Sequence, residues 1–491
     1  MYDLSQYLKK IDQVIRQGPY SDNWHSLSSY SVPEWYRAAK FGIFIHWGVF
    51  SVPAFANEWY PRNMYIKDSA EYRHHIEKYG KHTDFGYKDF IPLFKAERFD
   101  PKEWAELFAA SGARYVVPVA EHHDGFQMYK SEISHWNSYE KGPQRDVLGE
   151  LKAAADSFGI ETGASSHRAE HWFFLGGGKD FESDIKEPLE RGDLYWPSMP
   201  AAELHDIFSE PSPTDEFLQD WLVRTCEIID RYKPKIIYFD WWIQHRAFKP
   251  YLKKLAAYYY NRAFEWGTEV VINYKHDGFM FGTAVPDVER GQFAERKPFF
   301  WQTDTSVALN SWCYTENNTY RRAEDLVCDL VDIVSKNGCM LLNIGPKADG
   351  TIPAEDKNIL MNIGKWLKIN GEAVYGTNIW RRSAEGPTEI PEGQFTDGIP
   401  KNFTCKDIRF TTANGYLYAT VLRRSTRGEY VISSLYIKDA SHRDNFCGII
   451  NGISVLGTDK KPLWERRADG VHIQTDYHNG DYPIVFKIEI D

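Results

Sequence analysis

The sequence predicts an α/β protein in which a (β/α)8-type barrel is followed by a C-terminal antiparallel β-sandwich domain. Compact apolar runs alternate with amphipathic helical segments over most of the 491-residue chain, and polar side chains gather where the runs end. Repeated strand–helix alternation favours a parallel sheet, and eight such units favour a barrel. After about residue 375 the pattern changes to short alternating strands. We therefore predict a catalytic barrel with an N-terminal extension over residues 1–375 and the sandwich over residues 376–491.

Each predicted barrel strand is a run of apolar, β-branched or aromatic residues without polar alternation, which is typical of a strand buried on both faces. In chain order the runs are 41–46, 115–120, 159–165, 235–240, 269–273, 286–289, 299–302 and 340–343, of which 286–289 is the weakest. The predicted helices between them are 101–111, 147–158, 217–232, 250–266 and 320–337. Long inserts follow the first and third strands, where they would lie on the catalytic face of a barrel.

The last part of the chain has the pattern of an antiparallel sandwich. Short alternating runs at 416–422, 430–435 and 484–490 are separated by Gly, Asn and Asp turns. No low-complexity linker precedes them, so we expect this domain to pack firmly against the barrel.

Composition narrows the class of function. The chain carries a net charge of -11 and has no sustained basic run, so nucleic acid and anionic membranes are not expected partners. No apolar run is long enough to cross a membrane. The first ten residues contain no apolar export segment and the six cysteines are scattered, so we expect a cytoplasmic protein. The sequence leaves a homo-oligomer open.

The second predicted strand ends in an unusual concentration of titratable groups. Glu121, His122, His123 and Asp124 follow a buried run directly, and parallel sheets place binding and catalytic groups at that end. A metal site, a clamp for a polar small molecule and a solvated loop all fit this segment. The other predicted strands end in further polar side chains, namely His46, Ser165 to His167, Asp240, Asn273, Glu289 and Asp304.

Two carboxylates stand out among these residues. Asp240 lies among aromatic and aliphatic neighbours, where a carboxylate is costly to bury without partners or a task. With Glu289 it would supply the minimum equipment for glycoside hydrolysis. The structural alternatives are a helix cap for Asp240 and a plain ion pair between Glu289 and Arg290. Asp287, Glu295 and Asp304 remain possible substitutes for Glu289.

A competing signal is the H-x-x-E-H pattern at residues 167–171, which is found in one class of zinc peptidases. A zinc-dependent hydrolase using His122 and His123, or His167 and His171, is therefore an alternative function. The context disfavours it, because the pattern follows a strand directly and leads into WFFLGGG instead of a long helix. A noncatalytic carbohydrate-binding protein is a further alternative. His74, His75 and His82 lie in a charged segment, and we expect them to be solvated.

Several long motifs occur together in one order: AKFGIFIHWG at 39–48, EWY at 58–60, EHHDGF at 121–126, YFDWW at 238–242, DVERG at 287–291, FWQTD at 300–304 and LLNIGPKADG at 341–350. In these motifs the chain resembles the α-L-fucosidases of glycoside hydrolase family 29. The resemblance implies a barrel followed by a β-sandwich, and a retaining exo-glycosidase that removes terminal α-L-fucose through a covalent glycosyl-enzyme.

The same resemblance implies roles for individual residues. Asp240 matches the nucleophile, and Glu289 is carried over as the general acid/base, a role whose position varies within the family, so Glu295 and Asp287 stay open. The remaining pocket residues that it implies, or that lie in the matching segments, are His46, Glu58, Trp59, His122, His123, His167 and Trp242. The expected substrate is a fucosylated oligosaccharide, and no cofactor or metal is expected. The linkage preference depends on loops outside the fucose pocket.

Overall fold

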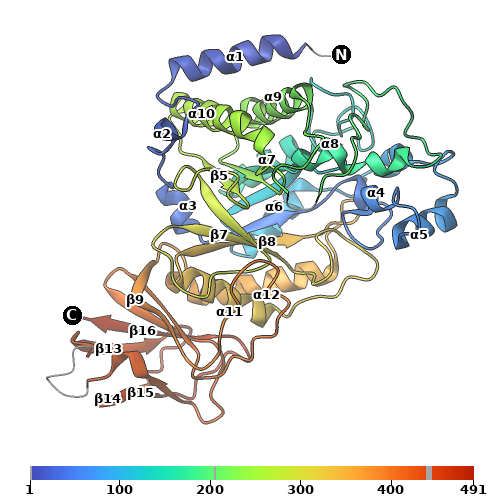
Figure 1. The fold of residues 1–491 in the computed structure, drawn as a ribbon. Coiled ribbons are helices and arrows are strands. Elements are labelled where there is room, and N and C mark those ends of the chain that lie inside the picture. The colour runs from blue at the N-terminus through green and yellow to red at the C-terminus, as the bar shows by residue number, and fades with distance from the viewer. Residues whose placement is uncertain (1–2, 204–205, 438–444) are drawn as a thin grey trace.

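A computed structural model describes residues 3–203, 206–437 and 445–491, and it confirms the predicted barrel (Figure 1). Each strand pairs in parallel with the next, and the last returns to pair with the first, so the sheet closes. The strands are β1 (Phe41–Ile45), β2 (Tyr115–Glu121), β3 (Glu161–Ser166), β4 (Ile236–Phe239), β5 (Val271–Tyr274), β6 (Val285–Glu289), β7 (Trp301–Ser306) and β8 (Gly338–Ile344). Every predicted run overlaps one of these strands, with ends that differ by up to four residues.

Alternating side chains explain why these runs form a barrel and not a one-sided sheet. One set, including Phe44, Val117, Tyr238 and Leu341, fills the interior. The alternate set, such as Ile43 on β1, packs outward in the cores that the strands share with the helices. Both faces of each strand are therefore apolar, as a barrel enclosed by helices requires.

The outer layer is formed by α6 (Pro101–Ala110), α7 (Val147–Ser157), α9 (Asp215–Tyr232), α10 (Lys249–Trp266), α11 (Ala323–Ser335) and α12 (Ala354–Asn370). Local signals mark their ends. Asp100 accepts hydrogen bonds from the first turn of α6, and Gly267 ends α10 with φ 64°. The N-terminal extension forms α1 (Leu4–Gln17), which packs across α9 and α10 (Figure 1). None of the helices in the described residues has the length and apolar composition needed to cross a bilayer.

Shorter helices lie in the N-terminal segment and in the inserts. They are α2 (Trp24–Leu27), α3 (Glu34–Ala39), α4 (Tyr60–Asn63), α5 (Ala70–Tyr79) and α8 (His171–Phe174). The expectation that the histidines of α5 and its flank are solvated was wrong for His75 and His82. Both are buried, with rings stacked 4.3 Å apart, and each bonds a backbone carbonyl. Aromatic neighbours such as Phe85 and Phe90 enclose them, and burial lowers the pKa of His75 to about 4.

The C-terminal region consists of two antiparallel sheets that share one core, which confirms the predicted sandwich. The five-stranded sheet contains, in order, β13 (Ile450–Val455), β16 (Ile484–Ile490), β11 (Tyr416–Val421), β10 (Ile408–Ala413) and β9 (Asn378–Glu385). The three-stranded sheet contains β12 (Glu429–Ile432), β15 (Gly470–Gln474) and β14 (Leu463–Arg467). Phe410 and Phe486 from the first sheet meet Ile432 and Val471 from the second.

The sandwich is joined to the barrel through α11 and α12, which lie between the two parts (Figure 1). Asp332 on α11 is fully buried and pairs with Arg409 on β10. The indole nitrogen of Trp366 on α12 donates to the carbonyl of Pro483 at 2.9 Å. Val485 belongs to the same apolar cluster as the barrel helices. The packing between the two parts is thus continuous with the main core.

Candidate active site

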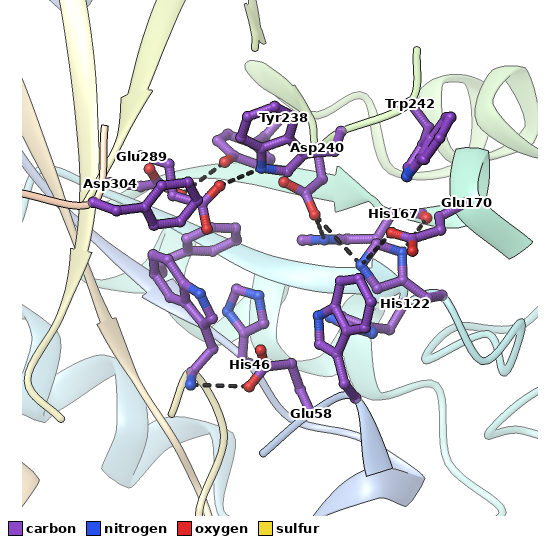
Figure 2. Close-up of a pocket in the computed structure, with 16 residues that line it drawn as sticks. His46, Glu58, His122, His167, Glu170, Tyr238, Asp240, Trp242, Glu289 and Asp304 are labelled. Atoms are coloured by element: carbon purple, nitrogen blue, oxygen red, sulfur yellow. Dashed lines mark hydrogen bonds and ion pairs between the residues drawn. The ribbon is translucent and has the colours of Figure 1, made fainter. Parts of the chain in front are cut away.

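The carboxyl ends of the barrel strands surround one pocket of about 270 Å³ (Figure 2). Such a volume lies at the small end of the range for ligand sites, which suits a compact ligand. The nine residues predicted as catalytic or substrate-binding all line it: His46, Glu58, Trp59, His122, His123, His167, Asp240, Trp242 and Glu289. The pocket also contains Phe44, Glu170, Tyr238, Trp241, Asp304, Trp312 and Phe395.

Asp240 follows β4 and occupies the centre of the group in Figure 2, between Glu289 and Asp304 on one side and His167 and Glu170 on the other. Its Oδ2 accepts a hydrogen bond from Nδ1 of His167 at 3.1 Å. It caps no helix, because the next helical turn begins at Arg246.

The charge state of Asp240 is set by these neighbours. Burial alone would raise its pKa, but hydrogen bonds from His123 and His167 outweigh burial and hold the pKa well below the ordinary value. The carboxylate is therefore ionised over the whole physiological range.

His123 lies between two carboxylates. Its Nε2 is 3.5 Å from Asp240 Oδ2 and 3.5 Å from Glu170 Oε2, while its Nδ1 donates to the carbonyl of His167 at 2.8 Å. Burial would lower the pKa of His123, but the charges of Glu170 and Asp240 raise it to about 9. The imidazolium therefore links the β2 end to Asp240. A register shift between β2 and β3 next to this residue is typical of active-site edges.

Glu289 ends β6 and faces Lys275, which follows β5. The lysine Nζ lies 2.9 Å from Glu289 Oε2, and the indole of Trp241 donates to the same oxygen. Burial raises the pKa of Glu289 to about 7, although the lysine charge opposes the shift. The alternative of an ion pair with Arg290 is absent from the ion pairs of the described residues, and that guanidinium binds the Ala308 and Ser311 carbonyls.

The substitutes considered for Glu289 occupy different surroundings. Glu295 is exposed and does not line the pocket. Asp287 is buried behind the pocket, where Gln302 and Lys275 bind its carboxylate at 2.7 and 3.2 Å. Asp304 does line the pocket, but it accepts from the Tyr238 hydroxyl at 2.8 Å and from Lys275 at 3.1 Å. Glu289 is the most exposed of the three buried carboxylates, with 9% of its side chain accessible against 2% for Asp304 and 0% for Asp287.

Lys275 was not found from the sequence. It is buried among three carboxylates, whose charges outweigh its burial and raise its pKa. The available signal was its position directly after the fifth predicted strand, where the other strands also carry polar groups.

Imidazole and aromatic groups form the wall of the pocket opposite Asp240 and Glu289. His46 follows β1, and its Nδ1 donates to Oδ1 of Asn343 at 2.8 Å, which leaves Nε2 as the hydrogen-bond acceptor. Burial lowers the pKa values of His46 and His122, so both rings are neutral. Glu58 accepts from the Trp312 amide at 3.0 Å, and burial raises its pKa.

His167 holds Asp240 in position, and Trp242 lies two residues after Asp240 on the same loop. His167 donates to Asp240, and its Nε2 lies 3.0 Å from the Ser165 hydroxyl, so both ring nitrogens have protein partners. This geometry favours a positioning role for a residue predicted to contact the sugar. Trp242 has φ 75°, which is rare for a bulky residue and common where strain serves a site, and its ring packs on Phe173.

The acidic residues that flank His122 and His123 bind side chains from other segments of the chain. Glu121 pairs with Arg168 at 2.6 Å and Arg224 at 3.2 Å. Asp124 accepts from the Tyr87 hydroxyl at 2.6 Å. Both carboxylates stabilise the loops that carry the pocket, and neither forms a hydrogen bond to an imidazole among the described contacts.

The H-x-x-E-H pattern does not assemble a zinc site. His171 begins the short helix α8, and its two ring nitrogens lie 2.7 Å from the carbonyl oxygen of His123 and 3.0 Å from that of Trp196. His167 faces the pocket instead.

Two groups of ligand-type atoms do lie within 4.8 Å of one another, namely His46, His122 and His167, and His123, His167 and Asp240. Both need His167, whose nitrogens already have partners, and the second needs deprotonated His123. A metal ion would have to displace these contacts.

The pocket of this parallel barrel combines the ionised Asp240 with Glu289, a carboxyl group whose pKa is raised to about 7, among histidines and tryptophans. A glycoside hydrolase needs a pair of carboxyl groups of this kind. The comparisons with known proteins agree. The family model described as alpha-L-fucosidase matches residues 7–372. A Dictyostelium discoideum alpha-L-fucosidase is 32% identical over 394 residues, covering 76% of this chain and 78% of the relative.

Two further relatives extend this likeness. The rat tissue alpha-L-fucosidase is 33% identical over 418 residues, covering 82% of this chain and 79% of the relative. The crystal structure of Thermotoga maritima alpha-fucosidase with a mechanism-based inhibitor matches with a TM-score of 0.75 and 29% identity, covering 96% of this chain and 99% of that one. The chain belongs to the α-L-fucosidase family, as its motifs predicted, and it is a fucose-releasing glycosidase.

Proposed function

We propose that this protein is a retaining exo-α-L-fucosidase in which Asp240 is the nucleophile and Glu289 the general acid/base. The observation that carries the proposal is the opposite shift of two carboxyl pKa values in one pocket, below the ordinary range for Asp240 and to about 7 for Glu289. A nucleophile must be ionised, whereas an acid must hold a proton at the working pH.

The first step breaks the glycosidic bond. An Asp240 oxygen attacks C1 of the fucosyl group and forms an ester, while Glu289 gives its proton to the departing oxygen. Lys275 at 2.9 Å and the Trp241 indole then stabilise the Glu289 carboxylate that is left. In the second step Glu289 takes a proton from water, the water oxygen attacks C1, and Asp240 is released. Fucose leaves with its original anomeric configuration.

The opposite wall is suited to hold the fucosyl group. Neutral His46 can accept a hydrogen bond from a sugar hydroxyl through Nε2, and the neutral ring of His122 can accept or donate one. Trp59 and Trp312 offer apolar faces for the ring carbons and the C5 methyl group. Support for a fucose pocket comes from a Thermotoga maritima alpha-fucosidase structure in complex with fucose, which matches with a TM-score of 0.74 and 29% identity. Fucosylated oligosaccharides are the proposed substrates.

The leaving-group dependence of Glu289→Ala tests the assignment of the acid. General acid catalysis contributes roughly a hundred- to ten-thousand-fold, so kcat/KM for a fucosyl disaccharide should fall by that order. An aryl fucoside with a good leaving group needs little protonation, and its kcat/KM should fall far less. Steady-state kinetics on both substrates measure the difference.

Glu295→Ala is the matched control, because Glu295 is an exposed carboxylate of the same segment. Its kinetics should equal those of the wild type on both substrates. Equal losses on the two substrates in Glu289→Ala, or the acid-type pattern in Glu295→Ala, would remove Glu289 from the role. A chelator included in these assays separates the zinc-dependent alternative, since loss of activity would favour it. Fucose binding without turnover of any fucoside would favour a noncatalytic protein.

A further inference from the structure

Phe395 is an exposed aromatic side chain that belongs to the segment after the barrel and yet lines the active-site pocket. It lies between β9 and β10, and 59% of its surface is exposed. An exposed phenyl ring at the mouth of a pocket is a candidate contact for a ligand, because solvent-exposed apolar surface often marks a binding site.

The backbone around Phe395 is fastened to the end of β6 by a short ladder, and we call residues 393–397 the strap. Gly393 and Gln292 exchange two main-chain hydrogen bonds at 2.9 and 3.2 Å. The Phe395 amide donates to the Glu289 carbonyl at 2.9 Å. Gly291 permits this close approach, since a Cβ there would lie 1.8 Å from the Gly393 oxygen.

The far end of the strap is fixed by Asp397. Its amide donates to the Arg290 carbonyl at 2.8 Å, and its carboxylate accepts from the Thr305 hydroxyl at 2.6 Å and pairs with Arg290 at 3.4 Å. Phe395 itself has φ 56°, a left-handed conformation that is unfavourable for a phenylalanine. The chain thus holds an exposed ring in a strained conformation between two anchored residues, which indicates a functional position.

The ring of Phe395 lies close to the proposed acid. Its plane is within 10° of the Trp241 indole, with centroids 6.2 Å apart. The Trp241 indole donates a hydrogen bond to the Glu289 carboxylate. His276 packs against the same indole, with ring centroids 4.2 Å apart. Two nearly parallel aromatic faces therefore lie beside the group that would protonate the leaving oxygen. The sugar attached to that oxygen must pass next to them.

We infer that Phe395, together with Trp241, forms a platform that binds the sugar on the leaving-group side of the scissile bond. The apolar face of that pyranose stacks on the platform, so the strap contributes to the choice of aglycone. The inference rests on the proposed function, because it assumes that Glu289 acts on the glycosidic oxygen. It makes Phe395 a specificity residue supplied from outside the barrel.

The test compares two substrates that share the fucosyl group. One is whichever fucosyl disaccharide, linked α1,2, α1,3, α1,4 or α1,6, the wild-type enzyme hydrolyses fastest. The other is α-L-fucosyl fluoride, which has no leaving-group sugar. The readout is the ratio of kcat/KM for the disaccharide to kcat/KM for the fluoride. In Phe395→Ala this ratio should fall about tenfold.

Three further variants separate the effect of the ring from a change in the strap itself. Phe395→Asn removes the ring but tolerates the left-handed conformation, so its ratio should fall as in the alanine variant. Phe395→Tyr keeps a stacking face and should retain the wild-type ratio. Phe264→Ala removes a phenyl ring that is 68% exposed on α10, and it should leave the ratio unchanged.

The platform would be overturned if the ratio in Phe395→Ala and Phe395→Asn stayed at the wild-type value, whether kcat/KM is unchanged on both substrates or falls equally on both. Failure of the wild-type enzyme to hydrolyse either substrate would instead overturn the proposed function, and the platform with it. The two failures are therefore distinguishable.

Discussion

Two carboxyl groups in one pocket hold different charges because their nearest partners differ. Asp240 meets the imidazoles of His123 and His167, which favour the anion. Glu289 has a cation at 2.9 Å in Lys275, yet that cation is shared with Asp287 and Asp304, so burial prevails and raises the pKa of Glu289 to about 7. The different charges of the two groups follow from their partners, because both histidines contact Asp240 whereas Glu289 shares its lysine with two other carboxylates.

The pH profile should report the proton on Glu289. The pKa of this group is raised to about 7, so the active, protonated form predominates below pH 7 and is lost as the pH rises through it. We expect kcat/KM for a fucosyl disaccharide to decline tenfold per pH unit above about pH 7. The profile of kcat/KM between pH 4 and 10 measures this limb.

A basic limb near pH 9 would have a different origin. His123 has a pKa of about 9, and its deprotonation would remove the cation beside Asp240. A profile that stays flat through pH 7 and falls only near 9 would therefore contradict Glu289 as the acid. The control is Glu289→Ala assayed on an aryl fucoside, which should lack the limb near 7.

At the residue scale the sequence predicted the pocket lining better than the contacts behind it. His46, His122 and Asp240 each end a strand, and the geometry of a parallel barrel brings all strand ends to one mouth. The contribution of Phe395 depends on a long-range backbone ladder to β6 that no local pattern encodes. The division of charge by Lys275 likewise requires distances between strands.

At the element scale the barrel strands could be predicted because burial on both faces leaves an uninterrupted apolar run. Helix α12 was not predicted. Its segment contains Gly364 in the interior, which lowers helix propensity. Tertiary packing explains the glycine, because α12 passes so close to α6 that a Cβ at Gly364 would lie 2.0 Å from the carbonyl oxygen of Ala110. The short sandwich strands were found only in part, since the predicted runs match β11, β12 and β16 but not β9, β10, β13, β14 or β15.

Gly364→Ala should destabilise the protein for this reason. Helix propensity alone would make the alanine variant more stable by about 1 kcal/mol, so a loss of stability isolates the packing effect. Overpacking typically costs about 1–3 kcal/mol. We expect a lower Tm, measured by circular dichroism.

Gly398→Ala is the matched control. No atom lies within 4 Å of a Cβ built there, and Gly398 is not among the residues with positive φ. Its Tm should match that of the wild type. An increase of Tm in Gly364→Ala would show that the two helices are not in the contact described.

At the scale of the whole molecule, barrel and sandwich share one continuous core. The main apolar cluster runs from the barrel helices to Val485 in the sandwich. Asp332 and Arg409 form a buried ion pair across the boundary, and separating such a pair is costly because the buried carboxylate loses one of its cations. The strap adds a third link, from the β9–β10 connection to β6.

Thermal unfolding should therefore be a single transition. Scanning calorimetry of the full chain should show one endotherm, in which the tertiary signals of both parts are lost together. Two separated endotherms would contradict a shared core. Arg409→Met, which leaves the buried Asp332 with Lys336 at 2.6 Å as its cationic partner and removes the pair across the boundary, should lower the temperature of that one transition without splitting it.

The central claim is that the fold places Asp240 where it forms a covalent bond to fucose. 2-Deoxy-2-fluoro-α-L-fucosyl fluoride tests it, because the fluorine at C2 slows both steps through an oxocarbenium-like transition state while the fluoride leaving group favours the first. The inactivated enzyme is digested and its peptides are analysed by mass spectrometry. We predict one 2-fluorofucosyl group per chain, on the peptide that contains Asp240, and no label in Asp240→Asn. A label on Glu289 or elsewhere, or hydrolysis that proceeds without any covalent adduct, would contradict the account.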